Sequence, residues 1–250
     1  MSDRDLILVH NHKGGTGKTM LSVHLAHYLA RSGQEWTVWD ADTQGNAMSW
    51  VTEHQWDGQR SIRYSEEGQA DIIATIDQST ALGRDRLIVD TPPTEKIIRD
   101  LLGVVELGNG DILLCPANGR LAIGGSIKVA EEVAGTGCRV VLVPNLTDPK
   151  HAHGQSEIDA LREVADLDRI NAEVFQLAIP RNDQYMRRAE EEGKPIWDLD
   201  YGTRTHTGKA LKALCSWINQ GAPPDENPPS GESGQGGPIS GDLKDRLWNQ

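Results

Sequence analysis

A glycine-rich loop between an apolar run and an amphipathic run, near the start of the chain, is the feature that most limits the possible folds. LILVH at 6–10 predicts a buried strand, and KGGTGK at 13–18 forms the loop. Apolar residues then recur at helical spacing until a stop signal at Ser32-Gly33: Leu21, Leu25, Tyr28 and Leu29. A strand, a glycine-rich loop with lysine and threonine, and a helix in this order predict a phosphate-binding loop.

The rest of the chain repeats the alternation of strand and helix. Apolar runs of strand length lie at 36–41, 86–90, 111–116, 138–144 and 173–180. Segments with helical periodicity lie between and after them, as at 160–167 and 209–218. Near-continuous apolar strands separated by helices predict an α/β fold of the P-loop NTPase type, with a mostly parallel, doubly wound sheet and helices on both faces. We expect one domain over 1–220, followed by a disordered tail rich in Pro, Gly and Ser over 221–250.

Composition excludes several classes of protein. None of the apolar runs reaches the roughly 18 residues of a membrane span, and the charged N-terminus is unlike a signal peptide. Three widely spaced cysteines do not predict disulfides or a zinc site, which favours a cytoplasmic protein. The net charge of −12 argues against binding polyanions by bulk charge, so any contact with nucleic acid requires a local basic patch.

The loop itself suggests its chemistry. Glycine-rich backbone can wrap phosphates with its N–H groups, Lys18 can reach the β- and γ-phosphates, and Thr19 can hold Mg²⁺. A second lysine, Lys13, stands on the other side of the glycines. From the residues alone, Lys13 is either an exposed loop lysine or a further phosphate contact.

Carboxylates follow two other predicted strands. Asp90 ends the strand at 86–90 and is expected to fix the magnesium ion, directly or through water. Asp40 and Asp42 come at the end of the strand at 36–41. They could orient an attacking water near the metal ion, or they could be ordinary cap and turn residues.

Three motifs together resemble the ParA/MinD family of deviant Walker-A ATPases: KGGTGKT, DADTQGNA and RLIVDTPP. Similarity to the ParA branch continues in VLVPNLTD at 141–148, in the segment 177–200 and in YGTRTHTGKALKAL from 201. The resemblance covers roughly residues 5–219.

The resemblance implies a site for ATP and Mg²⁺ that works in an ATP-dependent homodimer. Lys13 matches the signature lysine that contacts the ATP of the partner subunit, and Lys18 matches the ordinary loop lysine. Asp42 matches the aspartate that positions the attacking water. The other implied contacts are Gly14, Gly15, Thr16, Gly17, Thr19 and Met20 for the nucleotide, Thr19, Asp40 and Asp90 for the metal ion, and Asn145 and Pro180 for adenine.

The resemblance also implies a biological role. ATP-bound dimers of this kind bind DNA nonspecifically, and a ParB-like or cargo-adaptor partner stimulates slow hydrolysis, so that a plasmid, chromosome or protein assembly is positioned. Such a protein is cytoplasmic and associates with the nucleoid when ATP is bound. The candidate DNA contacts are Arg187, Arg188, Arg204, Lys209 and Lys212. Acidic residues such as Glu190 and Glu192 are interleaved with them, so a mixed-charge solvated surface is the alternative.

Two other functions are considered. A MinD-like membrane ATPase would need a C-terminal amphipathic helix, and 239–248 has apolar residues at the required spacing but carries two aspartates. Membrane binding is therefore not expected, and this end of the chain favours a short docking motif or an inert end. A metal-cluster enzyme of related fold would need paired cysteines, which Cys115 and Cys138 do not provide; Cys115 and Cys215 are expected to be buried thiols.

Overall fold

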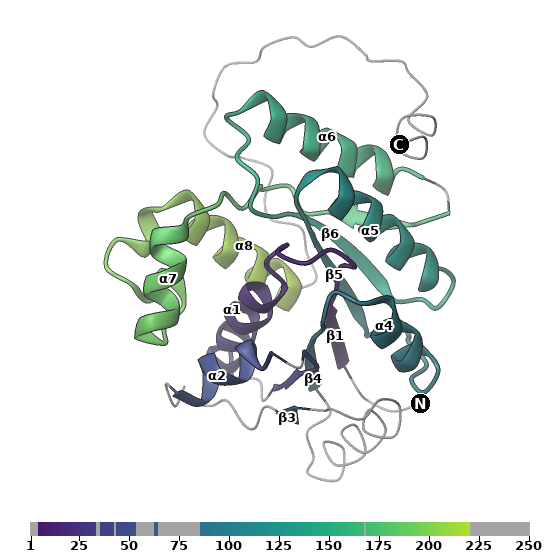
Figure 1. Ribbon diagram of the computed structural model, residues 1–250, viewed down its shortest axis with the longest axis horizontal. Helices are drawn as coiled ribbons and strands as arrows, with labels where there is room; N and C mark the ends of the chain where they lie inside the picture. Colours follow the sequence, from purple (N-terminus) through teal and green to yellow (C-terminus); the bar gives the residue numbers. More distant parts are fainter. Residues whose placement is uncertain are drawn as a thin grey trace.

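The computed structural model describes residues 5–33, 36–42, 44–53, 63–64, 86–167 and 169–220, which form a single α/β domain (Figure 1). Its strands, in chain order, are β1 (Asp5–Val9), β2 (Thr37–Asp40), β3 (Arg63–Tyr64), β4 (Arg86–Asp90), β5 (Ile112–Ala117), β6 (Arg139–Pro144) and β7 (Ala172–Val174). Its helices are α1 (Lys18–Arg31), α2 (Asn46–Glu53), α4 (Glu95–Leu102), α5 (Gly119–Glu132), α6 (Ala152–Ala165), α7 (Asp183–Glu192) and α8 (His206–Gln220), with short 3-10 turns η1 (Ile196–Asp198) and η2 (Gly202–Arg204).

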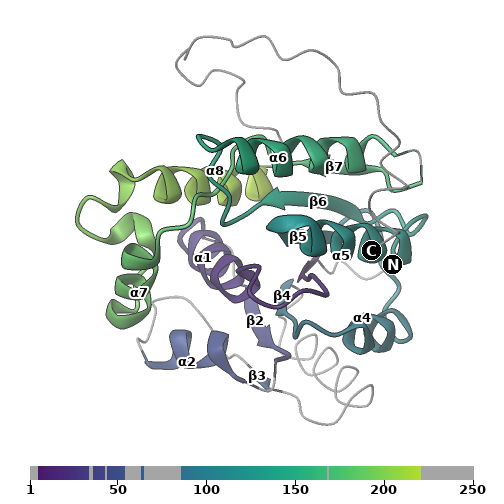
Figure 2. The same cartoon turned by 45° about the horizontal axis from the view of Figure 1, so that its top comes forward.

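The described strands form one parallel sheet in the order β3-β2-β4-β1-β5-β6-β7. Helices cover both faces, with α1, α2 and α8 on one side and α4, α5 and α6 on the other (Figures 1 and 2). The doubly wound parallel sheet predicted from the sequence is thereby confirmed.

Alternation along the central strand supplies two separate cores. Ile7 and Val9 pack with the apolar faces of α1, α2 and α8. Leu6 and Leu8 point to the opposite face and pack with α4, α5 and α6. Because both faces of β1 are buried, its sequence is continuously apolar rather than alternating.

The parallel topology brings three strand ends to one edge of the sheet. In the register of the sheet, Asp90 of β4 pairs with Val9 of β1 on one side and with Asp40 of β2 on the other. The glycine-rich loop follows β1 directly, and β1 lies between β4 and β5. At this edge the chain crosses from one face of the sheet to the other, which is where ligands bind in such folds.

The sequence was wrong about the length of the last strand. The run 173–180 is a strand only over Ala172–Val174, and farther along it a single bridge joins Ile179 to Asn145. Phe175 is buried in the core on the α1 side. The apolar run is therefore explained by burial in the core, although the chain beyond Val174 is not a strand. The two-residue strand β3 was not predicted.

Buried aromatic and thiol side chains account for other sequence features. Trp36, Trp39 and Trp50 are core residues, whereas Trp56 lies outside the described residues. Cys115 and Cys215 are buried, as expected. The predicted disordered tail at 221–250 also lies outside the described residues. Among the described helices, none combines the length and apolarity needed to cross a membrane.

Candidate nucleotide site

The glycine-rich loop forms one wall of a cleft of about 700 Å³ at the carboxyl edge of the sheet. Residues 14–20 line it from the loop and the start of α1, and Asp42 and Trp50 line it from the β2–α2 region. The opposite wall comes from α7 and the residues just before it, namely Arg181, Asp183, Met186, Arg187 and Glu190. The predicted loop residues thus share one cleft with a wall that the sequence did not indicate.

Positive backbone angles show why the loop needs glycine. Gly15 and Gly17 have φ values of 73° and 85°, in the left-handed region that other residues rarely adopt. Gly17 immediately precedes α1, so the free N–H groups of the first helical turn open toward the cleft. A helix N-terminus with this geometry favours an anionic ligand.

Lys18 is held close to the loop by two backbone carbonyls. Its Nζ donates to the carbonyl oxygens of Asn11 and Lys13, at 3.3 Å in each case, and the residue is 7% exposed. Burial lowers the pKa of its ammonium, while the nearby carboxylates of Asp90 and Asp42 raise it. A cation held this way can exchange two neutral carbonyls for phosphate oxygens.

The side-chain oxygens of Thr19 and Asp90, both predicted to hold magnesium, lie within hydrogen-bond distance of each other. Oγ1 of Thr19 donates to Oδ2 of Asp90 at 2.7 Å, and Ser22 donates to Oδ1 of the same carboxylate at 3.0 Å. Burial, with a smaller contribution from Asp40, raises the pKa of Asp90 to about 7, although the hydrogen bonds from Thr19 and Ser22 lower it. Hydroxyl and carboxylate oxygens are the ligands that Mg²⁺ prefers, and a cation here would stabilise the buried carboxylate, so the residues fit the ion.

Asp40 and Asp42 differ in how their oxygens are used. Both oxygens of Asp40 accept backbone N–H groups, from Asp42 at 3.1 Å and Met48 at 2.9 Å, and its side chain is fully buried. Asp40 therefore shapes the turn into α2, and its metal role remains a prediction. Asp42 lines the cleft, with one oxygen accepting from the backbone of Gln44. Of the two, only Asp42 is placed to meet a water in the cleft.

Asn145 fastens the loop from the end of β6. Its Nδ2 donates to the carbonyl of Thr16 at 2.6 Å, and a Cβ on Gly17 would collide with that same nitrogen. Its Oδ1 is buried and has no hydrogen-bond partner among the described residues, so an acceptor is left near the cleft. Pro180 is partly buried and its carbonyl accepts from Thr207; its neighbour Arg181, rather than Pro180, lines the cleft. The adenine role of Asn145 and Pro180 remains a prediction.

Sequence reasoning missed Asn11, which anchors the loop on the other side. Its Nδ2 lies within 3.0 Å of the carbonyls of Pro116 and Ala122 and of Ser126 Oγ, and its Oδ1 accepts from the backbone of Lys13. These bonds join β1, β5 and α5 at the loop. In the sequence, Asn11 is only a polar residue that follows the apolar run 6–10. That pattern is too common to indicate that its side chain holds the loop.

Lys13 is not among the residues that line the cleft. Its side chain is exposed, and it lines a separate groove of about 370 Å³ together with residues of α5, among them Arg120, Leu121 and Gly124. Within the described part of the chain, its ammonium makes no hydrogen bond or ion pair. The two lysines of the loop are thus on different surfaces, with Lys18 at the cleft and Lys13 outside it.

The structure separates the predicted DNA contacts into two sets. Arg187 lines the nucleotide cleft, and Arg188 is paired with Glu192 at 2.9 Å. Arg204, Lys209 and Lys212 are exposed on η2 and α8, where Lys209 and Lys212 line a shallow hollow. Among the described residues these three form no ion pair, and the DNA role of all five stays a prediction.

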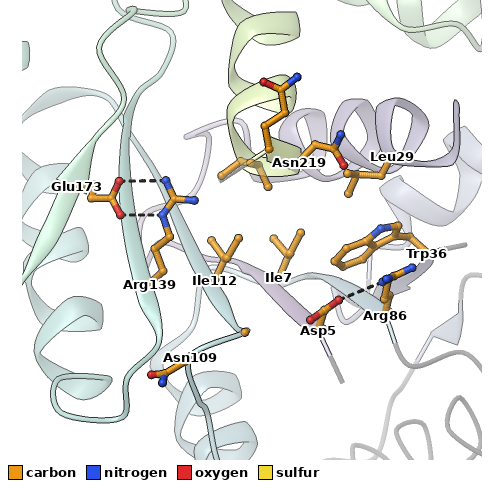
Figure 3. A pocket seen from close by; sticks show the side chains of 13 residues that line it. Asp5, Ile7, Leu29, Trp36, Arg86, Asn109, Ile112, Arg139, Glu173 and Asn219 are labelled. Atoms are coloured by element: carbon orange, nitrogen blue, oxygen red, sulfur yellow. Dashed lines mark hydrogen bonds and ion pairs between the residues drawn. The ribbon is translucent and has the colours of Figure 1, made fainter. Parts of the chain in front are cut away.

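A second hollow, of about 600 Å³, lies at the opposite edge of the sheet (Figure 3). Its two arginines are already paired, Arg86 with Asp5 at 3.1 Å and Arg139 with Glu173 at 2.7 Å. Ile7, Ile112 and Trp36 form an apolar side. With its arginines paired and no glycine-rich loop, this hollow is a poor phosphate site, and the chemistry is assigned to the carboxyl edge.

Comparison with known proteins identifies the family. The model of the CobQ/CobB/MinD/ParA nucleotide-binding domain matches residues 7–196, which is most of the chain. The chain belongs to this family. The chromosome-partitioning ATPase Soj of Thermus thermophilus is 51% identical over 43 residues, a stretch that spans only 17% of either chain.

Solved structures agree on the fold. MinD of Aquifex aeolicus gives a TM-score of 0.64 at 15% identity, with 88% of this chain and 99% of that chain covered. McdA of Cyanothece in complex with ATP gives 0.61 at 15% identity, with 88% and 98% covered. MinD of Pyrococcus horikoshii with Mg-ADP gives 0.61 at 17% identity, with 87% and 96% covered. At these identities the likeness concerns the fold.

As a member of this family, the chain carries a nucleotide-binding domain. Lys18 and the start of α1 line the cleft, where they are placed to contact phosphates, and Asp42 lines it with one oxygen bound to the backbone of Gln44; their roles remain predictions. Thr19 and Asp90 would hold the metal ion, which supplies charge neutralisation on the phosphates when bound. Asn11 and Asn145 keep the loop in its binding shape beforehand.

Proposed function

We propose that the chain is a ParA-type ATPase that dimerises with ATP, binds DNA nonspecifically and positions or partitions a cargo with an activating partner. The observation that supports this proposal is that the two lysines of the loop line different surface hollows. Lys18 is at its own cleft, whereas Lys13 is exposed on the α5 side and away from that cleft. A lysine there can meet the phosphates of a second copy, in line with the family resemblance.

Charge explains why such a dimer would depend on the triphosphate. Two copies of a chain with a net charge of −12 repel each other, and two bound ATP molecules add further negative charge at the interface. A lysine donated by each copy to the other's phosphates offsets that repulsion only while ATP is bound. Ligand binding to the dimer alone then drives association by mass action.

The test compares two variants of the same loop. Light scattering with ATP, in the hydrolysis-blocked background Asp42→Ala, should show a dimer for the parent and monomers for Lys13→Ala that still bind ATP. Lys18→Ala should lose ATP binding itself, which separates the two roles. Dimers of undiminished stability in Lys13→Ala would remove the support for the proposal.

DNA binding is assigned to the patch of Arg204, Lys209 and Lys212, because these exposed cations lie on one surface of η2 and α8. Retention on DNA should require ATP and fall steeply with salt. Replacing Lys209 and Lys212 by alanine should abolish it, while the control Lys150→Ala, an exposed lysine outside the patch, should leave it unchanged. Salt-insensitive retention, or equal loss in the control, would contradict this assignment.

A MinD-like role at the membrane is the second candidate, resting on the apolar spacing at 239–248. Flotation with anionic vesicles, with and without residues 236–250, separates the two roles. We expect no ATP-dependent flotation of either form. Flotation that disappears with the truncation would favour the membrane role.

A further inference from the structure

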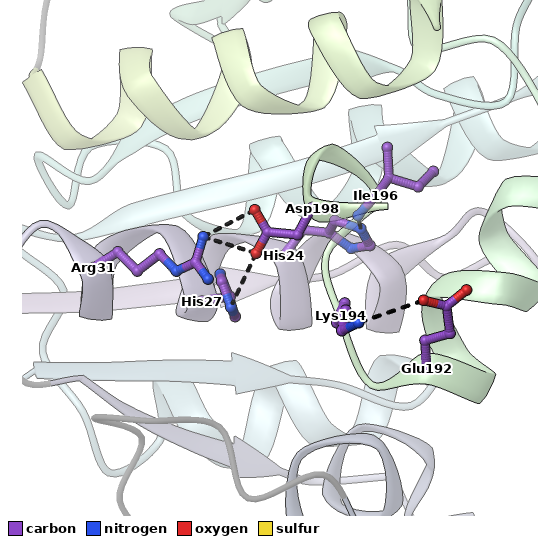
Figure 4. A network of polar contacts seen from close by, with 7 residues as sticks. All are labelled: His24, His27, Arg31, Glu192, Lys194, Ile196 and Asp198. Carbon is purple, nitrogen blue, oxygen red and sulfur yellow. Dashed lines mark hydrogen bonds and ion pairs between the residues drawn. The ribbon is translucent and has the colours of Figure 1, made fainter. Parts of the chain in front are cut away.

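His24 lies in a network of polar contacts between α1 and the segment that follows α7 (Figure 4). It is fully buried on α1, and its Nε2 accepts the backbone N–H of Ile196 at 3.1 Å. Nδ1 then carries the proton and donates to the carbonyl of Met20 at 2.7 Å. The neutral ring therefore bridges the first turns of α1 and the turn η1.

Two tryptophans enclose the same ring. Trp50 of α2 and Trp197 of η1 meet His24 edge to face, with centroids 5.7 and 5.3 Å away. Trp50 and Met20 also line the nucleotide cleft. His24 thus contacts three elements, and two of the residues it touches form part of the cleft surface.

The next residue of η1 is fixed on the same face of α1. Asp198 accepts from Arg31 at 2.7 Å and lies 3.9 Å from His27. Residues 24, 27 and 31 share one helix face by their spacing. From behind, Gly202 packs so closely on the carbonyl of Ile196 that a Cβ there would collide with it. The turn η1 is therefore held between α1 and the η2–α8 region.

This attachment fixes the far wall of the cleft. Helix α7 ends at Glu192, and Gly193, Lys194 and Pro195 alone connect it to Ile196. Met186, Arg187 and Glu190 of α7 face the loop across the cleft. His24 lies on α1, and α1 begins at Lys18, the lysine predicted to bind phosphate. The bond from Ile196 to His24 is thus one of the contacts that fix α7 relative to the loop, beside the bond from the hydroxyl of Tyr185 to the carbonyl of Asp200.

We propose that His24 is a positioning residue of the ATPase, which holds the α7 wall at its working distance from the phosphate-binding loop without touching the nucleotide. The residue acts on nucleotide affinity, because both walls must contact the ligand at once. Chemistry at the phosphates depends on Lys18, Thr19 and Asp42, none of which contacts His24 in the structure. The proposal needs only the ATPase site and is independent of dimerisation and of DNA.

The experiment compares His24→Leu, which removes the acceptor for Ile196, with His24→Gln, whose side-chain oxygen can replace it. His153→Leu is the matched control, because the side chain of His153 is 81% exposed on α6. Binding of fluorescent ADP gives the Kd, and steady-state hydrolysis of ATP gives KM and kcat. Hydrogen exchange with and without ADP reports the protection of α7.

We expect His24→Leu to raise the Kd for ADP and the KM for ATP about tenfold, equivalent to about 1.4 kcal/mol, with kcat within about twofold. The protection of α7 by ADP should be lost in this variant, and His24→Gln should restore most of the affinity. Wild-type affinity in a folded His24→Leu, or a His24→Gln no better than it, would overturn the proposal.

If His24→Leu does not fold, Asp198→Ala takes its place. This variant removes the ion pair between η1 and Arg31 of α1, and because Asp198 is exposed it leaves no buried cavity. We then expect a Kd for ADP raised about threefold, equivalent to about 0.7 kcal/mol, and weaker protection of α7. An unchanged Kd in Asp198→Ala would overturn the proposal in that case. Loss of dimers or of DNA binding with an unchanged Kd would point to the proposed function instead.

Discussion

Acid should destabilise the protein through its buried neutral histidines, and His24 allows the effect to be isolated. Burial lowers the pKa of His24 to about 4, below the ordinary value of 6.5. Its ring also accepts the N–H of Ile196, which a protonated ring cannot do. Unfolding frees the ring to take up a proton at any pH between the two values.

The sign follows from proton binding in the two states. Between pH 4 and pH 6.5 the unfolded chain binds a proton at this site and the folded chain does not, so stability rises with pH across that window. At pH 5.5 the difference is about 0.9 proton, and from pH 7 to pH 5 the contribution of His24 to the free energy of unfolding falls by about 2 kcal/mol. Below pH 4 the loss is complete.

Urea unfolding at pH 7, 6 and 5 measures this contribution as the difference between the wild type and His24→Gln. Glutamine keeps an acceptor for Ile196 but does not titrate, so the variant should lose about 2 kcal/mol less stability between pH 7 and pH 5. Groups that do not interact with His24, such as His10, cancel in the difference, whereas His27 cancels only in part, because the charge of His24 contributes to its lowered pKa. Parallel pH profiles for the two proteins would refute the reasoning.

The remaining predictions concern the cleft. Asp42→Ala should keep ATP binding and abolish turnover, and an active variant in a hydrolysis assay would show that another group holds the water. Gly15→Ala and Gly17→Ala both place alanine at a positive φ, at a cost of about 1–2 kcal/mol each. Only Gly17→Ala also collides with Asn145, so thermal unfolding should show a larger loss for it, and equal losses would contradict the contact. Asn145→Ala should weaken ADP binding about tenfold in a titration, because Thr16 loses the bond that fixes the loop; wild-type affinity would assign Asn145 no part in the site.

Local patterns were enough to predict the phosphate side of the site. The loop, Thr19 and the strand ending in Asp90 are each encoded within a few residues, and parallel topology brings strand ends to one edge. Thr19 and Asp90, both predicted to hold the metal ion, lie together with their oxygens 2.7 Å apart, and their metal role stays a prediction. Ser22, which donates to the same carboxylate, follows Thr19 by three residues but has no motif of its own.

The opposite wall could not be predicted, because it depends on contacts between distant parts of the chain. His24 meets Ile196 across 172 positions, and Asn145 meets Thr16 across 129. The charge pattern placed Arg187 and Arg188 together on a DNA surface, whereas neighbouring positions on a helix point in different directions. Arg187 faces the nucleotide cleft and Arg188 pairs with Glu192.

The two walls of the cleft are held in unequal ways, and this bears on how the ATPase changes shape. Asn11 ties the loop to β5 and α5, and Asn145 ties it to the end of β6, so its shape is fixed before any ligand arrives. Helix α7 is joined through a three-residue connector to η1, which a bond to His24 and an ion pair to Arg31 hold, and its Tyr185 donates to the carbonyl of Asp200. Because the contacts of the loop go directly to the sheet and to α5, whereas those of α7 go to the turns beyond it, we expect a ligand that spans the cleft to displace α7 more readily than the loop.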